Sequence, residues 1–303
     1  PAGEILNQEN IFVMDEGQAN VQDIRPLEIV ILNLMPLKED TELQLLRSLS
    51  NTPLQLNISF LTVTSHQATH TTASHLNKFY LMLQDVRNCF FDGMIITGAP
   101  VEQMKFEEVD YWDELCEILD WADEHVTSIL HLCWGAQAAL YHRYGIEKKE
   151  LGYKLFGIYN HKVMNRKIPL VRGFDDYFFA PHSRWTEVSK LDIEKCSDLV
   201  ILAESRDAGV FLAMSRSGRR IYCMGHPEYD RMTLDREYKR DVNKGIRIQI
   251  PKNYYPDDDP DNKPRLVWRG HANALYTNWV NYYCYQLTPY SLGTRVYTYE
   301  NLH

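Results

Sequence analysis

The chain has 303 residues, of which 45% are hydrophobic, and a formal net charge of −9. This length and apolar content suffice for a large buried core, so one domain with extensions is expected. The acidic balance and the dispersed cationic residues argue against a dedicated nucleic-acid binder. No run approaches the ~18 apolar residues of a transmembrane helix, and no signal peptide is visible, so we expect a cytoplasmic protein without a membrane partner.

The first half of the chain alternates apolar strands with helices. Residues 1–26 are mixed and polar and are expected to form an arm over the surface. A buried strand over 27–34 precedes a helix with an apolar face that ends near residue 51. Further predicted elements are a strand over 54–63, a helix over 75–86, a strand over 92–97, a helix over 109–125 and a strand over 126–132. This order predicts right-handed crossovers and a mostly parallel α/β sheet.

The second half has a different pattern. Residues 152–188 are rich in glycine, aromatics and histidine and are expected to form extended segments. Strands over 198–204, 209–214 and 220–224, with a turn at 215–219, predict an antiparallel edge to the sheet. The last predicted elements are a helix over 233–243, a loop over 250–264 and a helix over 271–287. We therefore divide the chain into the arm, an α/β domain over 27–245, and a C-terminal loop and helix over 246–303 packed on it.

Neither a metal nor a resident cofactor is expected. The six cysteines include no C-x-x-C pair, so zinc and redox-dithiol sites are not predicted. His66 and His70 have the i, i+4 spacing of ligands on a helix, but their Ser/Thr-rich surroundings favour a polar loop.

The segment L-H-L-C-W-G-A-Q-A-A-L contains the first candidate catalytic group, Cys133. It joins an apolar strand to an alanine-rich helix, the arrangement of a nucleophile elbow. The small Gly135 lets such a turn close, and the amides at the helix N-terminus favour a thiolate at Cys133. A lone cysteine is more often a buried core residue, so the elbow alone leaves both interpretations open.

A second strand end carries the partners that a nucleophile needs. Residues 220–228 read R-I-Y-C-M-G-H-P-E, so His226 and Glu228 follow directly on an apolar strand. A base and its orienting carboxylate complete a cysteine triad, and the carboxyl ends of strands are where open α/β sheets form their sites. The sequence therefore predicts a Cys133–His226–Glu228 triad.

With these motifs, the chain resembles the homoserine O-acyltransferase family of methionine biosynthesis. The segments that carry the resemblance are N-L-M-P-L-K (33–38), S-H-L-N-K-F-Y (74–80), T-G-A-P-V-E (97–102), H-L-C-W-G-A-Q-A-A-L-Y (131–141), R-G-F-D-D-Y-F-F-A-P-H-S-R (172–184) and G-H-P-E-Y (225–229). The resemblance implies a flavodoxin-like sheet of the class I glutamine amidotransferase type, with helices on both faces, antiparallel additions and a C-terminal helical extension. It also implies acyl transfer through a Cys133 thioester with ping-pong kinetics, and a homodimer.

The same resemblance implies the binding residues. Arg240 matches the substrate arginine of the family, and a guanidinium suits the carboxylate of homoserine because it binds in a bidentate way. Lys154 and Ser183 match other substrate positions, and Lys38 matches a lysine near the site. The Trp134 amide is one expected oxyanion donor, and the second should come from 37–38 or 97–100.

Glu102 predicts which acyl group is transferred. In this family glycine at its position accompanies succinyl-CoA, whereas glutamate accompanies acetyl-CoA. A carboxylate there repels and crowds a succinyl carboxylate but leaves room for a methyl. We therefore expect acetyl-CoA as cosubstrate and L-homoserine as acceptor. Succinyl transfer and glutamine hydrolysis by an amidotransferase are the alternatives, and a non-catalytic binding module is a third.

Overall fold

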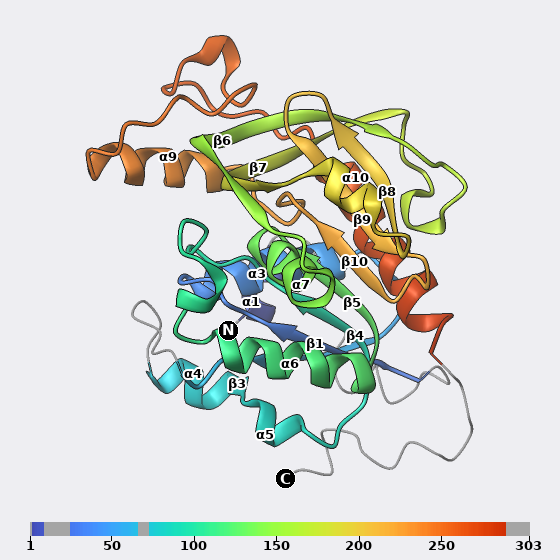
Figure 1. The fold of residues 1–303 in the computed structure, drawn as a ribbon. Coiled ribbons are helices and arrows are strands. Elements are labelled where there is room, and N and C mark those ends of the chain that lie inside the picture. The colour runs from blue at the N-terminus through green and yellow to red at the C-terminus, as the bar shows by residue number, and fades with distance from the viewer. Residues whose placement is uncertain (1, 9–24, 66–72, 289–303) are drawn as a thin grey trace.

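A single ten-stranded sheet organises the computed structural model, which describes residues 2–8, 25–65 and 73–288 (Figure 1). The strand order is β3-β2-β1-β4-β5-β10-β9-β8-β6-β7. The strands are β1 (Leu27–Leu32), β2 (Leu56–Leu61), β3 (Tyr80–Leu81), β4 (Phe91–Ile96), β5 (Val126–Leu132), β6 (Lys148–Val163), β7 (Tyr177–Val188), β8 (Leu199–Ser205), β9 (Gly209–Ser215) and β10 (Arg220–Cys223). The α-helices are α1 (Ala2–Gln8), α3 (Lys38–Leu49), α4 (Ala73–Phe79), α5 (Leu83–Val86), α6 (Trp112–His125), α7 (Trp134–Tyr144), α8 (Lys190–Lys195), α9 (Thr233–Asn243) and α10 (Arg269–Asn278).

The half of the sheet from β3 to β10 is parallel. β1 pairs with β2 and with β4, and β5 lies between β4 and β10, all in parallel register. The carboxyl ends of these strands therefore meet at one edge, where an open α/β sheet forms its site. The predicted α/β fold with a mostly parallel sheet is confirmed.

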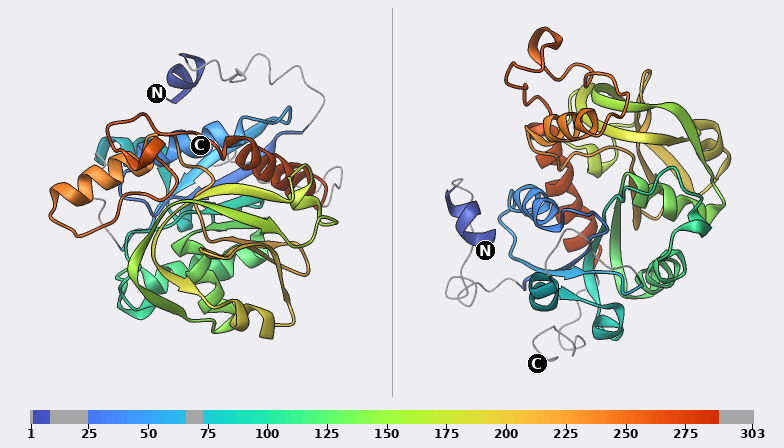
Figure 2. Two further views of the ribbon diagram at one scale, coloured as in Figure 1. Left: turned by 90° about the horizontal axis from the view of Figure 1, so that it is seen from above. Right: turned by 90° about the vertical axis from the view of Figure 1, so that its left-hand side faces the viewer.

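Helices cover both faces of this parallel half, so its strands are buried on both sides. In β1, Val30 and Leu32 join one core with α5, α6 and α7, whereas Ile29 and Ile31 join another with α3 and α10. Alternating side chains of a strand point to opposite faces, which explains the uninterrupted apolar sequence of β1. The two layers are seen from the side in Figure 2.

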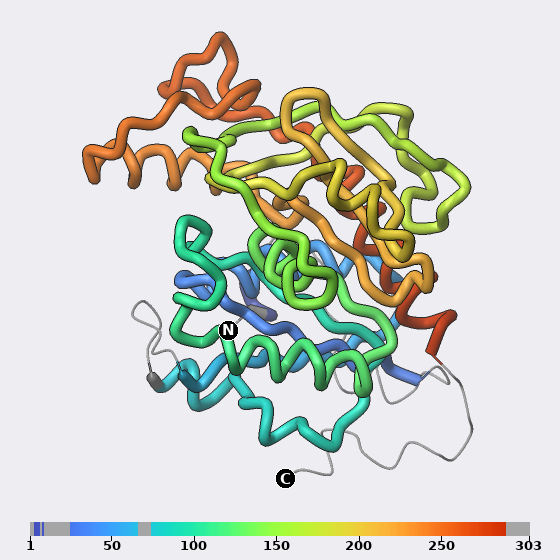
Figure 3. The backbone as a smooth tube through the Cα atoms, in the orientation of Figure 1, coloured from blue at the N-terminus to red at the C-terminus, as the bar shows by residue number. Residues whose placement is uncertain are grey.

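The other half of the sheet is antiparallel and extends above the parallel half. β10 pairs antiparallel with β9, β9 with β8, and β8 with β6, which pairs along its length with β7. The tube in Figure 3 shows β6 and β7 crossing over the end of the parallel strands. The prediction of extended segments over 152–188 is confirmed, since most of these residues lie in the two long strands β6 and β7.

The predicted helix over 75–86 is wrong in its middle. Helix α4 ends at Phe79, the strand β3 follows, and the short helix α5 begins at Leu83. Tyr80 and Leu81 pair with Phe60 and Leu61 of β2, so these two residues form the edge strand of the sheet instead of continuing the helix. Tertiary pairing here overrides local helix propensity.

The C-terminal helix over 271–287 also changes type. After α10 the chain continues as a π-helix, Trp279–Tyr285, that packs on the sheet. Gly93 of β4 makes room for it, because a Cβ there would lie 2.7 Å from the Cys284 sulfur and 2.9 Å from the Trp279 ring. The Trp279 indole N–H donates to the Ser128 hydroxyl at 3.0 Å.

The C-terminal loop is joined to β6 by backbone hydrogen bonds. Ile158 N–H donates to the Lys252 carbonyl at 2.8 Å, and Lys252 N–H donates to the Phe156 carbonyl at 2.9 Å. Gly157 between them has φ +138°, and a Cβ would meet the Lys252 backbone at 2.4 Å, so only glycine fits. The division into three parts remains a prediction, and most of the predicted arm lies outside the described residues.

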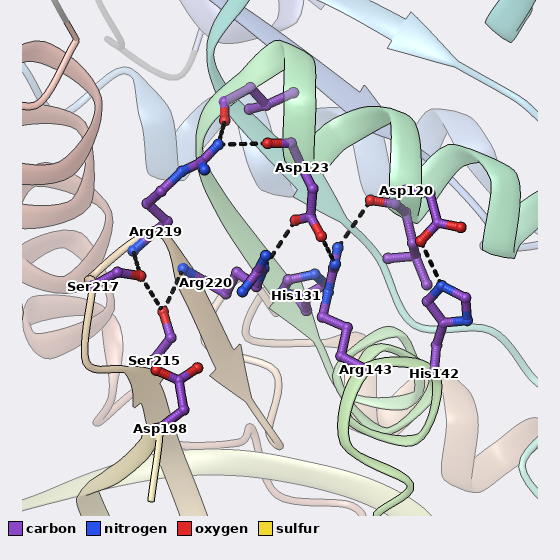
Figure 4. Close-up of polar contacts among 12 residues, drawn as sticks. Asp120, Asp123, His131, His142, Arg143, Asp198, Ser215, Ser217, Arg219 and Arg220 are labelled. Atoms are coloured by element: carbon purple, nitrogen blue, oxygen red, sulfur yellow. Dashed lines mark hydrogen bonds and ion pairs between the residues drawn. The ribbon is translucent and has the colours of Figure 1, made fainter.

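An ionic network closes the far end of α7. The Asp123 carboxylate of α6 pairs with Arg143 of α7 and, at 2.9 Å, with Arg220 of β10 (Figure 4). His142 pairs with Asp120 at 2.7 Å. The network ties α6, α7 and β10 together at the end of α7 opposite to Cys133.

Among the residues that the structure describes, no helix is both long and apolar enough to cross a membrane. No group of three or more His, Cys, Asp or Glu side chains there is arranged to hold a metal ion. His66 and His70 lie outside the described ranges.

Candidate active site

Cys133 stands at the sharp turn between β5 and α7. Its backbone has φ 47° and ψ −116°, a conformation that non-glycine residues rarely adopt. The Cys133 N–H donates to the Cys223 carbonyl at 2.7 Å, which fixes the turn against β10. Gly135 is required because a Cβ there would lie 2.5 Å from the Thr97 carbonyl. Strain of this kind, held by its surroundings, is typical of functional sites.

His226 and Glu228 follow β10 on the neighbouring strand end. The imidazole Nδ1 lies 2.8 Å from the Glu228 carboxylate, and both side chains are buried. The His226 ring stacks on Tyr229 with centroids 4.2 Å apart, and its backbone N–H donates to the Pro181 carbonyl at 2.9 Å. The contact with Glu228 occupies Nδ1 and leaves Nε2 as the ring nitrogen available to Cys133.

The electrostatics of the pair favour an imidazolium. Burial alone would lower the pKa of His226, but the negative charges of Cys133 and Glu228 and the hydrogen bonds to both raise it well above its usual value. A protonated imidazole between two anions is the resting state of a cysteine–histidine nucleophile. The three predicted triad residues are therefore together.

The turn after β4 lies directly against the nucleophile. A Cβ at Gly98 would be 3.3 Å from the Cys133 Cβ, 3.5 Å from the His226 ring and 3.7 Å from the Trp134 nitrogen. Of the two segments predicted to supply a second oxyanion donor, this turn is the one with such contacts. Lys38 instead donates to the Asn33 carbonyl at 2.5 Å, and burial lowers the pKa of this lysine to about 8.

Glu102, four residues beyond Gly98, is held toward the site. Its carboxylate accepts a hydrogen bond from the Trp185 N–H at 2.8 Å. Burial raises the pKa of Glu102, while the Trp185 amide and the charges of His226 and Lys154 lower it in part. The charge of this carboxyl group therefore interacts both with His226 of the triad and with Lys154, one of the predicted substrate residues.

Lys154 and Ser183 both contact the carboxylate of Glu237, a residue that was not predicted from the sequence. The Lys154 ammonium lies 2.9 Å from Asp241 and 3.3 Å from Glu237. Ser183 donates to the same Glu237, and so does the Tyr229 hydroxyl at 2.8 Å. Glu237 therefore connects both predicted substrate residues with the tyrosine on which His226 stacks.

Arg240 lies at the outer side of this cluster. Its guanidinium pairs with Asp241 at 2.7 Å, and half of the side chain, 50%, is exposed. Glu237 and Asp241 have the i, i+4 spacing of neighbours on one face of α9. That spacing is the signal that could have drawn attention to Glu237.

A segment of β7, residues 181–186, contacts His226, Glu237, Glu102 and Gln137. Besides the bonds of Pro181, Ser183 and Trp185, Thr186 forms a reciprocal pair with Gln137 on the first turn of α7. Its hydroxyl donates to the Gln137 amide oxygen at 2.8 Å, and its carbonyl accepts from the amide nitrogen at 3.2 Å. No local motif marks Gln137 or Thr186, because their contact depends on how β7 crosses α7.

Comparisons with known proteins identify the family of the chain. The chain matches the family described as homoserine O-succinyltransferase over residues 1–290. It is 66% identical to a homoserine O-acetyltransferase of Lachnoclostridium phytofermentans over 96% of this chain and 97% of the relative. It is 64% identical to a homoserine O-acetyltransferase of Agathobacter rectalis, over 96% and 94% of the two chains.

A solved structure shows the same fold at low sequence identity. A glutamine amidotransferase from Methylobacillus flagellatus superimposes with a TM-score of 0.55 at 12% identity, covering 89% of this chain and 98% of the other. That likeness concerns the fold alone, whereas the family match and the identity to the relatives extend over nearly the whole chain. The protein is thus an acyltransferase that belongs to the homoserine O-succinyltransferase family, built on a class I glutamine amidotransferase fold.

Proposed function

We propose that the protein transfers the acetyl group of acetyl-CoA to the hydroxyl of L-homoserine through a thioester on Cys133. The observation that carries the proposal is the Glu102 carboxyl group, which the Trp185 amide holds toward the site. The acetyltransferase names of the relatives at 66% and 64% identity support it. The reaction serves methionine biosynthesis in the family that the chain resembles.

In the first half-reaction, the Cys133 thiolate attacks the carbonyl carbon of acetyl-CoA. The negative charge that develops on the carbonyl oxygen needs fixed N–H donors. The Trp134 amide at the start of α7 and the backbone of the turn at 97–100 are the donors we propose, since both lie beside Cys133. The imidazolium of His226 gives its proton to the departing CoA sulfur, and the acetyl-enzyme remains.

In the second half-reaction, the neutral His226 takes the proton of the homoserine hydroxyl. The oxygen attacks the thioester, the tetrahedral intermediate expels the Cys133 thiolate, and the imidazolium is regenerated. Glu228 holds Nδ1 and stabilises the charged ring. Two half-reactions through one covalent intermediate give ping-pong kinetics.

The charged groups around Lys154 suit the two charges of an amino acid. The exposed part of the Arg240 guanidinium can bind the homoserine carboxylate. Glu237, which accepts from Ser183 and Tyr229, offers a carboxylate to the ammonium group. Lys154 balances the two acidic side chains of α9, so the cluster keeps one fixed geometry while it binds.

The test compares acyl donors on the purified protein. With acetyl-CoA alone, rapid quenching and peptide mass spectrometry should find one acetyl group, on Cys133. With homoserine, kcat/KM should be larger for acetyl-CoA than for succinyl-CoA. An acetyl group on another residue, or on none, contradicts the covalent mechanism. A preference for succinyl-CoA would instead favour the activity for which the matched family is named.

We further propose that two copies form the working assembly in the cytoplasm, as the family resemblance implies. Sedimentation analysis at several protein concentrations tests the dimer. A monomer that retains full activity would contradict it.

A further inference from the structure

Arg184 carries a buried charge that forms no ion pair with a carboxylate of the described residues. The side chain lies on β7 and only 2% of the residue is exposed. Its guanidinium donates to two backbone carbonyls, those of Thr186 at 2.5 Å and Ala208 at 2.6 Å. Within the described part of the chain, it forms no ion pair with an Asp or Glu. A buried charge without a counter-charge is costly, so this arginine needs an explanation beyond packing.

The third partner of the guanidinium is a neutral histidine. Arg184 Nε lies 3.4 Å from Nδ1 of His182, and Nε2 of His182 lies 3.0 Å from Nε2 of His161. Burial and the charge of Arg184 hold the pKa of His182 well below its usual value. His182 therefore accepts at Nδ1 and donates at Nε2, so the arginine is oriented without losing its positive charge.

The surroundings of Arg184 lead to the nucleophile by two routes. Pro181, three residues earlier on β7, accepts the backbone N–H of His226. Thr186, whose carbonyl Arg184 binds, is paired with Gln137 one turn after Cys133. Burial lowers the pKa of Arg184, and the negative charge of Cys133 is the largest influence that raises it, ahead of Glu187 and Glu102.

We propose that Arg184 is a positioning residue whose fixed positive charge keeps Cys133 a thiolate and makes it a better leaving group. This inference rests on the proposed role of Cys133 as nucleophile. The charge of His226 changes in each half-reaction, because its imidazole gives up a proton in the first and takes one in the second. A guanidinium is always protonated. Arg184 therefore supplies the constant part of the electrostatic field when the thioester is broken and the thiolate leaves.

The experiment measures the rate at which iodoacetamide alkylates Cys133 as a function of pH. Peptide mass spectrometry assigns the label, because Cys116 and Cys196 are more exposed than Cys133. The variants are Arg184→Gln, which removes the charge but keeps a donor, and Arg184→Lys, which keeps the charge. The Gln variant should raise the alkylation midpoint by about one pH unit, which lowers the rate about tenfold below the midpoint. The Lys variant should shift it by less than half as much.

Arg143→Gln is the matched control. Arg143 is also a buried arginine, but it pairs with Asp123 at the opposite end of α7, so its loss should leave the midpoint unchanged. An unchanged midpoint in a folded Arg184→Gln protein overturns the proposal. If that protein does not fold, the Lys variant decides. A near-normal midpoint supports the role of the charge, and a full-unit shift despite the retained charge overturns it.

Failure of the proposed function gives a different result. If the unmodified protein forms no acetyl group on Cys133, the thioester mechanism fails whatever the alkylation profile shows. If the thioester forms but the profile does not depend on Arg184, only the present inference fails.

Discussion

The two ends of helix α7 differ in whether the charged side chains near them form ion pairs. At the C-terminal end, Asp123 lies between Arg143 and Arg220, and Gly145 ends the helix in the left-handed conformation at φ 65°. At the N-terminal end, Cys133 has a positive φ of 47°, which is unfavourable for a residue other than glycine. The guanidinium of Arg184 is buried there and forms no ion pair within the described ranges.

The difference separates stability from chemistry along one helix. The C-terminal end pairs its charges and ends in a left-handed glycine, whereas the N-terminal end violates two rules of folding, with a strained cysteine backbone and a buried arginine. Natural proteins concentrate such violations at functional sites and compensate for them elsewhere. We therefore expect substitutions at the N-terminal end to change activity and those at the C-terminal end to change stability.

The largest effect is expected for Cys133→Ser. A serine hydroxyl is far less nucleophilic at neutral pH than a thiolate, so kcat for acetyl transfer should fall by at least about a thousandfold. The melting temperature should change little, because the change in side-chain volume is small. Activity within tenfold of the unmodified protein would show that the nucleophile lies elsewhere.

Glu228→Gln should lower kcat by roughly a hundredfold to ten thousandfold, as for other residues that orient a catalytic histidine. The amide keeps the contact with Nδ1 but no longer stabilises the imidazolium.

His226→Ala should abolish both half-reactions, and single-turnover acetylation of Cys133 measures the first. Near-normal acetylation in the His226 variant would exclude this residue as the proton carrier.

Glu102→Gly should shift the donor preference by on the order of a hundredfold toward succinyl-CoA, since a carboxylate that repels the succinyl group is removed. The measurement is the ratio of kcat/KM for acetyl-CoA and succinyl-CoA. Glu108→Gly, an exposed glutamate of the following turn, is the control and should leave the ratio unchanged. An unchanged ratio in the Glu102 variant would contradict its role as selector.

Arg143→Gln should reduce the free energy of unfolding by about 2 kcal/mol while acetyl transfer stays within twofold. Asp123 loses one of its two arginines but keeps Arg220, so the cost is smaller than for a fully broken buried pair. Urea unfolding and steady-state kinetics on the same sample provide both values. A large loss of activity with unchanged stability would reverse the comparison between the two ends.

The smallest effect is a pH dependence of the donor preference. Burial raises the pKa of Glu102, so its carboxylate becomes neutral, as the pH falls, before that of an exposed glutamate does. Repulsion of a succinyl group then weakens, and the preference for acetyl-CoA should fall severalfold toward low pH. His226 serves both donors, so its titration cancels in the ratio. A Glu102→Gln variant should show no such slope; an equal slope in both proteins would exclude Glu102 as its origin.

The sequence predicted those parts of the site that adjoin strand ends. Cys133 and His226 could be found because an apolar run stops at each and a turn follows. Lys154 and Ser183 came from the family resemblance, and the structure brings them to one carboxylate. Arg184 and Gln137 could not be predicted, because their roles depend on the register of β7 against α7, which no local pattern encodes. Tyr80 and Leu81 show the same limit for the fold, since a sheet edge, not their own sequence, makes them a strand.

The hydrogen bond between Glu102 and the Trp185 backbone has a consequence for how this family can diversify. The strand that carries Ser183, which we propose to bind the acceptor, contacts Glu102 through the main-chain amide of Trp185, and a main-chain amide does not depend on the side chain at that position. The carboxyl group that we propose to select the donor belongs instead to a separate loop. A change from glutamate to glycine in that loop should therefore alter the choice of acyl group without disturbing the strand. On this proposal, donor and acceptor choice are separable by mutation.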